Sequence, residues 1–102
     1  MTKHDEYADA AAHHGEYKIP EGKLVVVDLQ IVQGRLHNVR LSGDFFLEPP
    51  EALDAMSAAL NGLPYDAPQA RLEQVVQAAA GDAMMYGITA AGVAIAVRRT
   101  VA

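Results

Sequence analysis

The sequence predicts a two-layer α+β fold, in which a three-stranded antiparallel meander at residues 16–46 is followed by three helices packed on one of its faces. Three observations lead to this prediction. Apolar and polar residues alternate in the first half of the chain, and the apolar spacing becomes helical after Phe46. The strand-like segments also all precede the helix-like ones. The length of 102 residues is typical of one domain.

The clearest strand covers residues 23–32, and the segment before it, from residue 16, is the first strand. Four apolar side chains of the clearest strand alternate onto one face: Val25, Val27, Leu29 and Ile31. Gln33-Gly34 then turns the chain, because glycine readily takes a positive φ. Residues 35–42 return as the partner strand.

The returning strand has an irregular apolar pattern. Val39 and Leu41 share a face, whereas Leu36 has the opposite parity. A shift of one residue moves side chains across a sheet, so one extra residue would restore a continuous apolar face. We therefore predict a β-bulge near His37-Asn38.

Three helices are predicted near residues 49–61, 66–80 and 89–100. Pro49-Pro50 suits the start of the first helix. Asp66 is the expected N-cap of the second, and Thr89 that of the third. Residues 93–97 alternate like a strand, so their pattern alone leaves a helix and a strand open.

The N-terminal residues 1–14 are interpreted as a flexible tail, and residues 15–102 as the folded domain. This tail contains three of the four histidines. His4, His13 and His14 could bind a metal only if the tail folded around it, and adjacent histidines diverge on a helix and face opposite ways on a strand. We therefore predict no metal site.

The composition excludes several classes of protein. The net charge of −5 and the scattered basic residues argue against nucleic-acid binding. The longest apolar run, residues 88–97, is too short to span a bilayer, and the N-terminus has no hydrophobic signal region, so we expect a cytoplasmic protein. The absence of cysteine removes disulfides, thiol catalysis and cysteine-ligated metals.

The remaining candidates for chemistry are isolated. Asp44 follows Gly43 at a strand end, where a functional acid or an ordinary turn residue would both fit. Lys23 follows a lone glycine without the rest of a phosphate-binding loop. The apolar cluster Met84-Met85-Tyr86 is interpreted as core filling, with a binding surface as the alternative. We predict no catalytic residue and no cofactor bound by this chain alone.

The two phenylalanines, Phe45 and Phe46, are adjacent at the end of the strand region. Neighbouring residues of an extended chain point to opposite sides. One ring could therefore enter the core while the other is offered to a partner. Alternatively, both rings could pack between the sheet and the first helix.

Several blocks of the sequence resemble the C-terminal accessory domain of lipoate–protein ligase A. The similar features are Lys18, Pro20, Gly22, Lys23 and Leu24, Gly34, then Leu36, Val39 and Leu41 leading into Gly43-Asp44-Phe45-Phe46, and finally Pro50-Glu51-Ala52-Leu53, Leu60 and Gly62. Residues 87–99 are similar to the Gly-Val-Thr helix opening of that family, which favours a helix for the last segment. The resemblance covers roughly residues 16–102.

The resemblance implies a stand-alone accessory subunit, because the large catalytic domain that binds lipoate and ATP in this family is missing. It implies ATP and lipoate bound by a separate catalytic subunit, and a lipoyl-acceptor protein as a further possible partner. The residues that we predict at the partner interface are Lys23, Asp44, Phe45 and Phe46. A non-enzymatic module that binds lipoyl-acceptor domains is the main alternative, and a homodimeric domain without this role is another.

Overall fold

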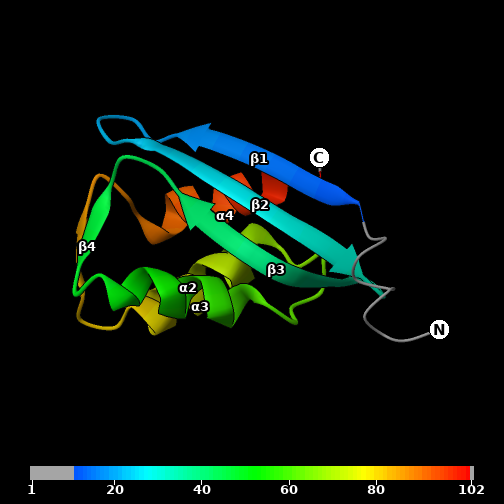
Figure 1. The fold of residues 1–102 in the computed structure, drawn as a ribbon. Helices are drawn as coiled ribbons and strands as arrows, with labels where there is room; N and C mark the ends of the chain where they lie inside the picture. Colours follow the sequence, from blue (N-terminus) through cyan, green and yellow to red (C-terminus); the bar gives the residue numbers. More distant parts are fainter. Residues whose placement is uncertain (1–10, 102) are drawn as a thin grey trace.

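The computed structural model of the chain describes residues 11–101 and confirms the predicted α+β class. A three-stranded antiparallel sheet forms one layer and the helices lie together on one of its faces (Figure 1). The elements in chain order are β1 (Ala12–Lys18), β2 (Leu24–Val32), β3 (Arg35–Ser42), β4 (Phe46–Glu48), α2 (Glu51–Leu60), α3 (Gln69–Ala80), β5 (Met84–Tyr86) and α4 (Ala90–Arg99).

The core lies between the three-stranded sheet and the helices. Val25, Val27 and Leu29 of β2, the central strand, are buried as their alternation predicts. They belong to one continuous apolar cluster with Leu72 and Val93 from two of the helices. Burial of apolar surface between the two layers is the main force that holds them together.

The predicted bulge in β3 is confirmed. Asp28 is paired with Arg40 and Gln30 with His37, so two residues of β3 lie opposite one residue of β2. Asn38 takes a φ of 53°, a left-handed conformation that asparagine tolerates better than most residues. The bulge lets Leu36 share the buried face with the apolar residues that follow it.

A second, two-stranded sheet was not predicted. The three-stranded sheet ends at Ser42, and β4 pairs instead with β5, which lies between α3 and α4 in the sequence. The expectation that all strands precede the helices is therefore wrong. Each of these strands has three residues, which is too short to show the alternation that identifies a strand in a sequence.

The predicted boundary between tail and domain at residue 14 is wrong, because β1 already begins at Ala12. Gly15 explains how closely this polar segment can approach the last helix. A Cβ atom at this position would lie 2.5 Å from the Ala96 carbonyl oxygen and 2.8 Å from the Thr100 nitrogen, so glycine lets β1 lie directly against α4. Residues 1–10 of the predicted tail lie outside the described residues.

The three helices lie close to their predicted positions. The start of α3 is the exception, because Pro68 and not Asp66 precedes its first residue. A proline disfavours helical conformation in the residue before it, so the helix cannot extend back to Asp66. Thr89 caps α4 as predicted, with its hydroxyl accepting a 3.0 Å hydrogen bond from the Gly92 N–H. The strand alternative for residues 93–97 is thus excluded.

Within residues 11–101, no helix combines the length and the apolar character needed to cross a bilayer.

Candidate protein-interaction surface

The four residues predicted at a partner interface meet at one end of the molecule. At this end the β1–β2 turn, the link after β3 and the β4–β5 ribbon come together (Figure 1). The Lys23 N–H donates a 2.9 Å hydrogen bond to the Gly87 carbonyl, which ties the β1–β2 turn to the residues after β5. Gly43 packs against the Leu24 carbonyl and the Phe45 ring so closely that a Cβ atom would collide with both.

The two phenylalanines have opposite environments. Phe45 is 9% exposed and belongs to the core, whereas Phe46 is 57% exposed. The alternative in which both rings pack between the sheet and the first helix is therefore wrong for Phe46. Because the chain is extended at β4, the two side chains cannot enter the same layer.

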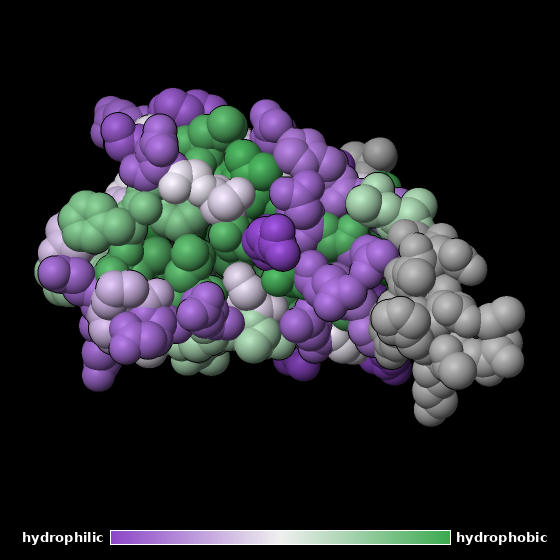
Figure 2. Space-filling view, in the orientation of Figure 1, coloured by the Kyte–Doolittle hydropathy of each residue, from purple (hydrophilic) through white to green (hydrophobic). Residues whose placement is uncertain are grey.

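The exposed side of the β4–β5 ribbon is apolar except for Glu48. The Phe46 ring stacks on the Tyr86 ring, with centroids 4.5 Å apart and planes 14° apart. Met84 is 57% exposed and Tyr86 38%, while Leu47, between the outward residues of β4, is buried. We call Phe46, Met84 and Tyr86 the apolar ribbon face. Figure 2 shows hydrophobic side chains gathered over the end of the molecule that carries β4, at the left of the view.

Two hollows flank this end of the molecule. One, of about 310 Å³, adjoins the apolar ribbon face and is lined by Phe45, Phe46, Leu47, Glu48, Pro50 and Leu53. The other, of about 360 Å³, is more polar and is lined by Lys18, Gly22, Lys23, Leu24, Gly43 and Asp44. The fold therefore brings Lys23 and Asp44 to one hollow, and Phe45 and Phe46 to its neighbour.

The structure corrects the interpretation of Met84-Met85-Tyr86 as core filling. Only Met85 packs against the core, and its two neighbours are exposed. The signal that could have found this ribbon is the local alternation, because residues 84 and 86 share a face in any strand. A three-residue strand paired to a distant segment gives no local sign that the shared face is the solvent-facing one.

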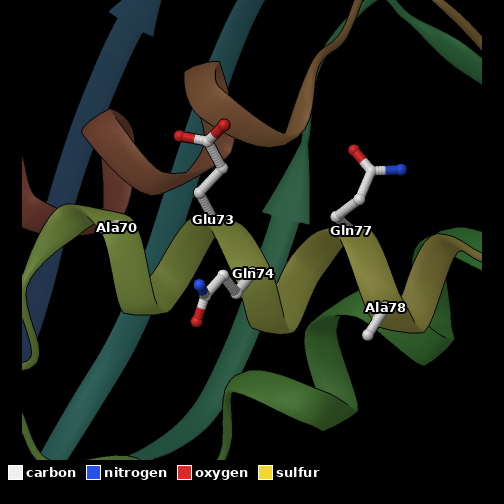
Figure 3. A pocket seen from close by; sticks show the side chains of 5 residues that line it. All are labelled: Ala70, Glu73, Gln74, Gln77 and Ala78. Carbon is white, nitrogen blue, oxygen red and sulfur yellow. The ribbon is translucent and has the colours of Figure 1, made fainter.

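A further hollow, of about 540 Å³, extends along α3. Its lining residues are Ala70, Glu73, Gln74, Gln77 and Ala78 (Figure 3). All five belong to one helix, and Glu73 and Gln77 extend away from Gln74 and Ala78. A binding site requires polar groups that converge from several directions, and this surface does not provide them.

The histidines of β1 face opposite sides of the strand. The His13 Nδ1 atom lies 3.2 Å from the Thr100 carbonyl oxygen on the helix side. On the outer side, the His14 ring lies between two carboxylates, with 2.7 Å from Nε2 to Glu16 Oε2 and 2.7 Å from Nδ1 to Asp28 Oδ1. Hydrogen bonds to Glu16 and then to Asp28 raise the pKa of His14, because both favour the protonated ring.

Of the three histidines considered for a metal site, His4 lies outside the described residues. Among residues 11–101, no group of three or more histidine, aspartate or glutamate side chains has the arrangement of a metal site. His37 flanks the β3 bulge and is paired with Gln30.

The fold and surface together define an α+β domain whose most distinctive feature is an exposed aromatic and apolar face beside a hollow. Such a face is suited to binding another molecule by burial of apolar surface. No protein-family model matches the chain, and no curated protein matches it in sequence.

One solved structure is similar in fold. It comes from a structural analysis of an archaeal lipoylation system, a bipartite lipoate protein ligase and its E2 lipoyl domain, from Thermoplasma acidophilum. The TM-score is 0.68 and the sequence identity 19%, over 87% of this chain and 97% of that chain. At this identity the similarity establishes a shared fold.

Proposed function

We propose that this chain is a non-catalytic accessory subunit of an ATP-dependent lipoate–protein ligase. In this proposal it supports the formation of lipoyl-adenylate by a separate catalytic subunit. The observation that carries the proposal is the exposure of Phe46 on the apolar ribbon face, because this residue belongs to the Gly-Asp-Phe-Phe block that resembles the accessory domain of the family. The shared fold with a chain from a bipartite ligase system supports it independently.

The chemistry explains why a catalytic subunit would need such a partner. An acyl-adenylate is attacked readily by water, so its yield depends on a pocket that closes and excludes solvent. A second subunit can order the elements that close the pocket without contributing a reactive group. ATP and lipoate would then bind to the catalytic subunit, and Lys23, which follows a lone glycine, would have no role as a phosphate-loop lysine.

The proposal is tested by measuring lipoate-dependent pyrophosphate release from ATP. The separately encoded catalytic chain is assayed alone, this chain alone, and the two together. We expect no release and no ATP binding by this chain alone, and a clear increase in release when it is added to the catalytic chain. A catalytic chain that is fully active by itself would show that the accessory role is wrong.

A second candidate function is a non-enzymatic module that binds lipoyl-acceptor domains. It is favoured by the presence of an E2 lipoyl domain in the same archaeal lipoylation system. Isothermal titration of this chain with an acceptor domain, in the absence of the catalytic chain, separates the two. Tight binding to the acceptor domain without any effect on adenylate formation would favour the second function.

A further inference from the structure

We propose that the apolar ribbon face is the surface that binds the catalytic subunit, and that it fits an apolar surface bordered by lysine or arginine side chains. This inference rests on the proposed function and specifies the partner surface. It follows from the position of three exposed apolar side chains and from the charges around them.

The apolar ribbon face combines a projecting group with a recess. The stacked rings of Phe46 and Tyr86 form a flat aromatic surface, with Met84 next to them on β5. The hollow of about 310 Å³ beside Phe46 has Leu47, Pro50 and Leu53 in its lining and can accept an apolar side chain. Aromatic residues in the centre of an interface, next to a recess on the same surface, are typical of the residues that contribute most to binding.

Three carboxylates lie on the ribbon or just before its strands, and Lys23 beside Asp44 is a cation at the same end. Glu48 is paired with Met84 in the ribbon register. Asp44 lies two residues before Phe46, and Asp82 two residues before Met84, and all three carboxylate residues are exposed. An apolar centre with an acidic border is complementary to an apolar surface with a basic border.

The same charges argue against a second copy of this chain as the occupant. Two copies in contact through this face would bring their acidic borders together in a molecule that already has a net charge of −5. The aromatic centre also favours a lasting subunit contact over a brief encounter with an acceptor domain, since permanent interfaces are the more hydrophobic ones.

The test measures the affinity of this chain for the separately encoded catalytic chain by isothermal titration. Phe46→Ser should weaken binding about 10- to 100-fold, because it removes the centre of the aromatic surface. Tyr65→Ser is the matched control. This variant also removes an exposed aromatic side chain, but at the opposite end of the molecule, where the Tyr65 N–H donates a hydrogen bond to the Gly34 carbonyl. The Tyr65→Ser variant should bind the catalytic chain with the affinity of the wild type.

A second pair of variants tests the acidic border. Glu48→Lys should slow association about 3- to 10-fold at low salt, and the difference should shrink as salt is added. Asp66→Lys, which reverses an exposed charge next to Tyr65, should not change the association rate. Thermal melts of all four variants confirm that each is folded before its affinity is interpreted.

The outcomes separate this inference from the proposed function. If the wild type neither binds nor activates the catalytic chain, the proposed function fails. If the wild type activates it and Phe46→Ser binds equally well, the accessory role stands and the assignment of the surface is wrong. Sedimentation of this chain alone provides a further test, since a dimer dissociated by Phe46→Ser would assign the face to a second copy and overturn the inference.

Discussion

The two sheets of this protein arrange their faces in opposite ways. The three-stranded sheet buries Val25, Val27 and Leu29 against the helices. Its outer side has polar groups such as His14 and Asp28 together with separate apolar residues such as Leu24 and Val26. The β4–β5 ribbon also buries residues on its inner side, but its outer side is the apolar ribbon face. The first arrangement is what folding alone requires of a half-buried sheet.

The outward side of the ribbon has no such explanation from folding. Exposed apolar side chains add nothing to the core and favour association, so a cluster of them at one place indicates a surface that binds something. Two adjacent residues show the same contrast: Phe45 is buried in the core, and Phe46 is exposed on the apolar ribbon face. The predictions below test whether the two regions differ in this way.

The largest expected effect is in the three-stranded sheet. Val27→Asp should lower the free energy of unfolding by more than about 4 kcal/mol, because it places an unpaired charge in a fully buried position. Leu72→Asp, on the helix side of the same core, should act similarly. Urea denaturation followed by circular dichroism measures both.

The control for this prediction is Val26→Asp, in the same strand with its side chain on the outer, half-exposed side. Val26→Asp should lower the free energy of unfolding far less than Val27→Asp does. Equal losses for the two variants would mean that the burial of the two faces is reversed.

The next effect separates the two phenylalanines. Phe45→Ala should cost about 3–5 kcal/mol of unfolding free energy, because it leaves a cavity in the core. Phe46→Ala should cost only about 1 kcal/mol, from the loss of its stacking on Tyr86. Denaturation curves of the two variants side by side provide the comparison, and similar losses would contradict a purely superficial position for Phe46.

A smaller effect is expected at the connection between the ribbon and α4. Thr89→Ala should lower the free energy of unfolding by about 1 kcal/mol, because it removes the hydroxyl that accepts a hydrogen bond from the Gly92 N–H. Thr89→Ser keeps the hydroxyl and should retain most of the stability. A serine variant as unstable as the alanine variant would show that the methyl group, and not the cap, is responsible.

The smallest effect concerns the polar outer side of the three-stranded sheet. Glu16 and Asp28 raise the pKa of His14 above its ordinary value of 6.5 in the folded state. Protonation of His14 therefore stabilises the folded state. This contribution is complete below pH 6.5 and is lost as the pH rises through the folded-state pKa. Desolvation of the ring opposes this rise in the pKa but is outweighed by the hydrogen bonds to the two carboxylates.

This pH dependence is measured by the melting temperature between about pH 5.5 and pH 8.5, a range that spans the titration of histidine. The wild type should lose slightly more stability toward high pH than His14→Gln, which cannot bind the proton. An NMR titration of the His14 ring checks the direction of the pKa shift directly. A value below that of a free histidine would contradict the two hydrogen bonds.

Local patterns in the sequence determined most of the fold. The alternation in β2, the parity change that requires the bulge at His37-Asn38, and the cap at Thr89 all depend on residues within a few positions of each other. The position of α3 was predicted apart from its first turn, where the effect of Pro68 on the preceding residue prevails over Asp66 as a cap.

The candidate surface was only partly within reach of the sequence. Lys23, Asp44, Phe45 and Phe46 were identified as a group by resemblance, and their interface role stays a prediction. Which phenylalanine is exposed was decided by the pairing of β4 with β5, two segments separated by two helices. The same pairing placed Met84 and Tyr86 beside Phe46.

By itself, then, the sequence determined the fold class, the first two helical segments and the apolar face of the central strand, because these follow from periodicities that short segments carry. For the last helix the periodicity left a strand open, and the resemblance favoured the helix. The tertiary structure alone decided where Gly15 lets β1 pack on α4, and which side of the β4–β5 ribbon faces solvent. Both depend on contacts between residues distant in the chain. No local pattern encodes such contacts, because whether a side chain is buried depends on what the rest of the chain places against it.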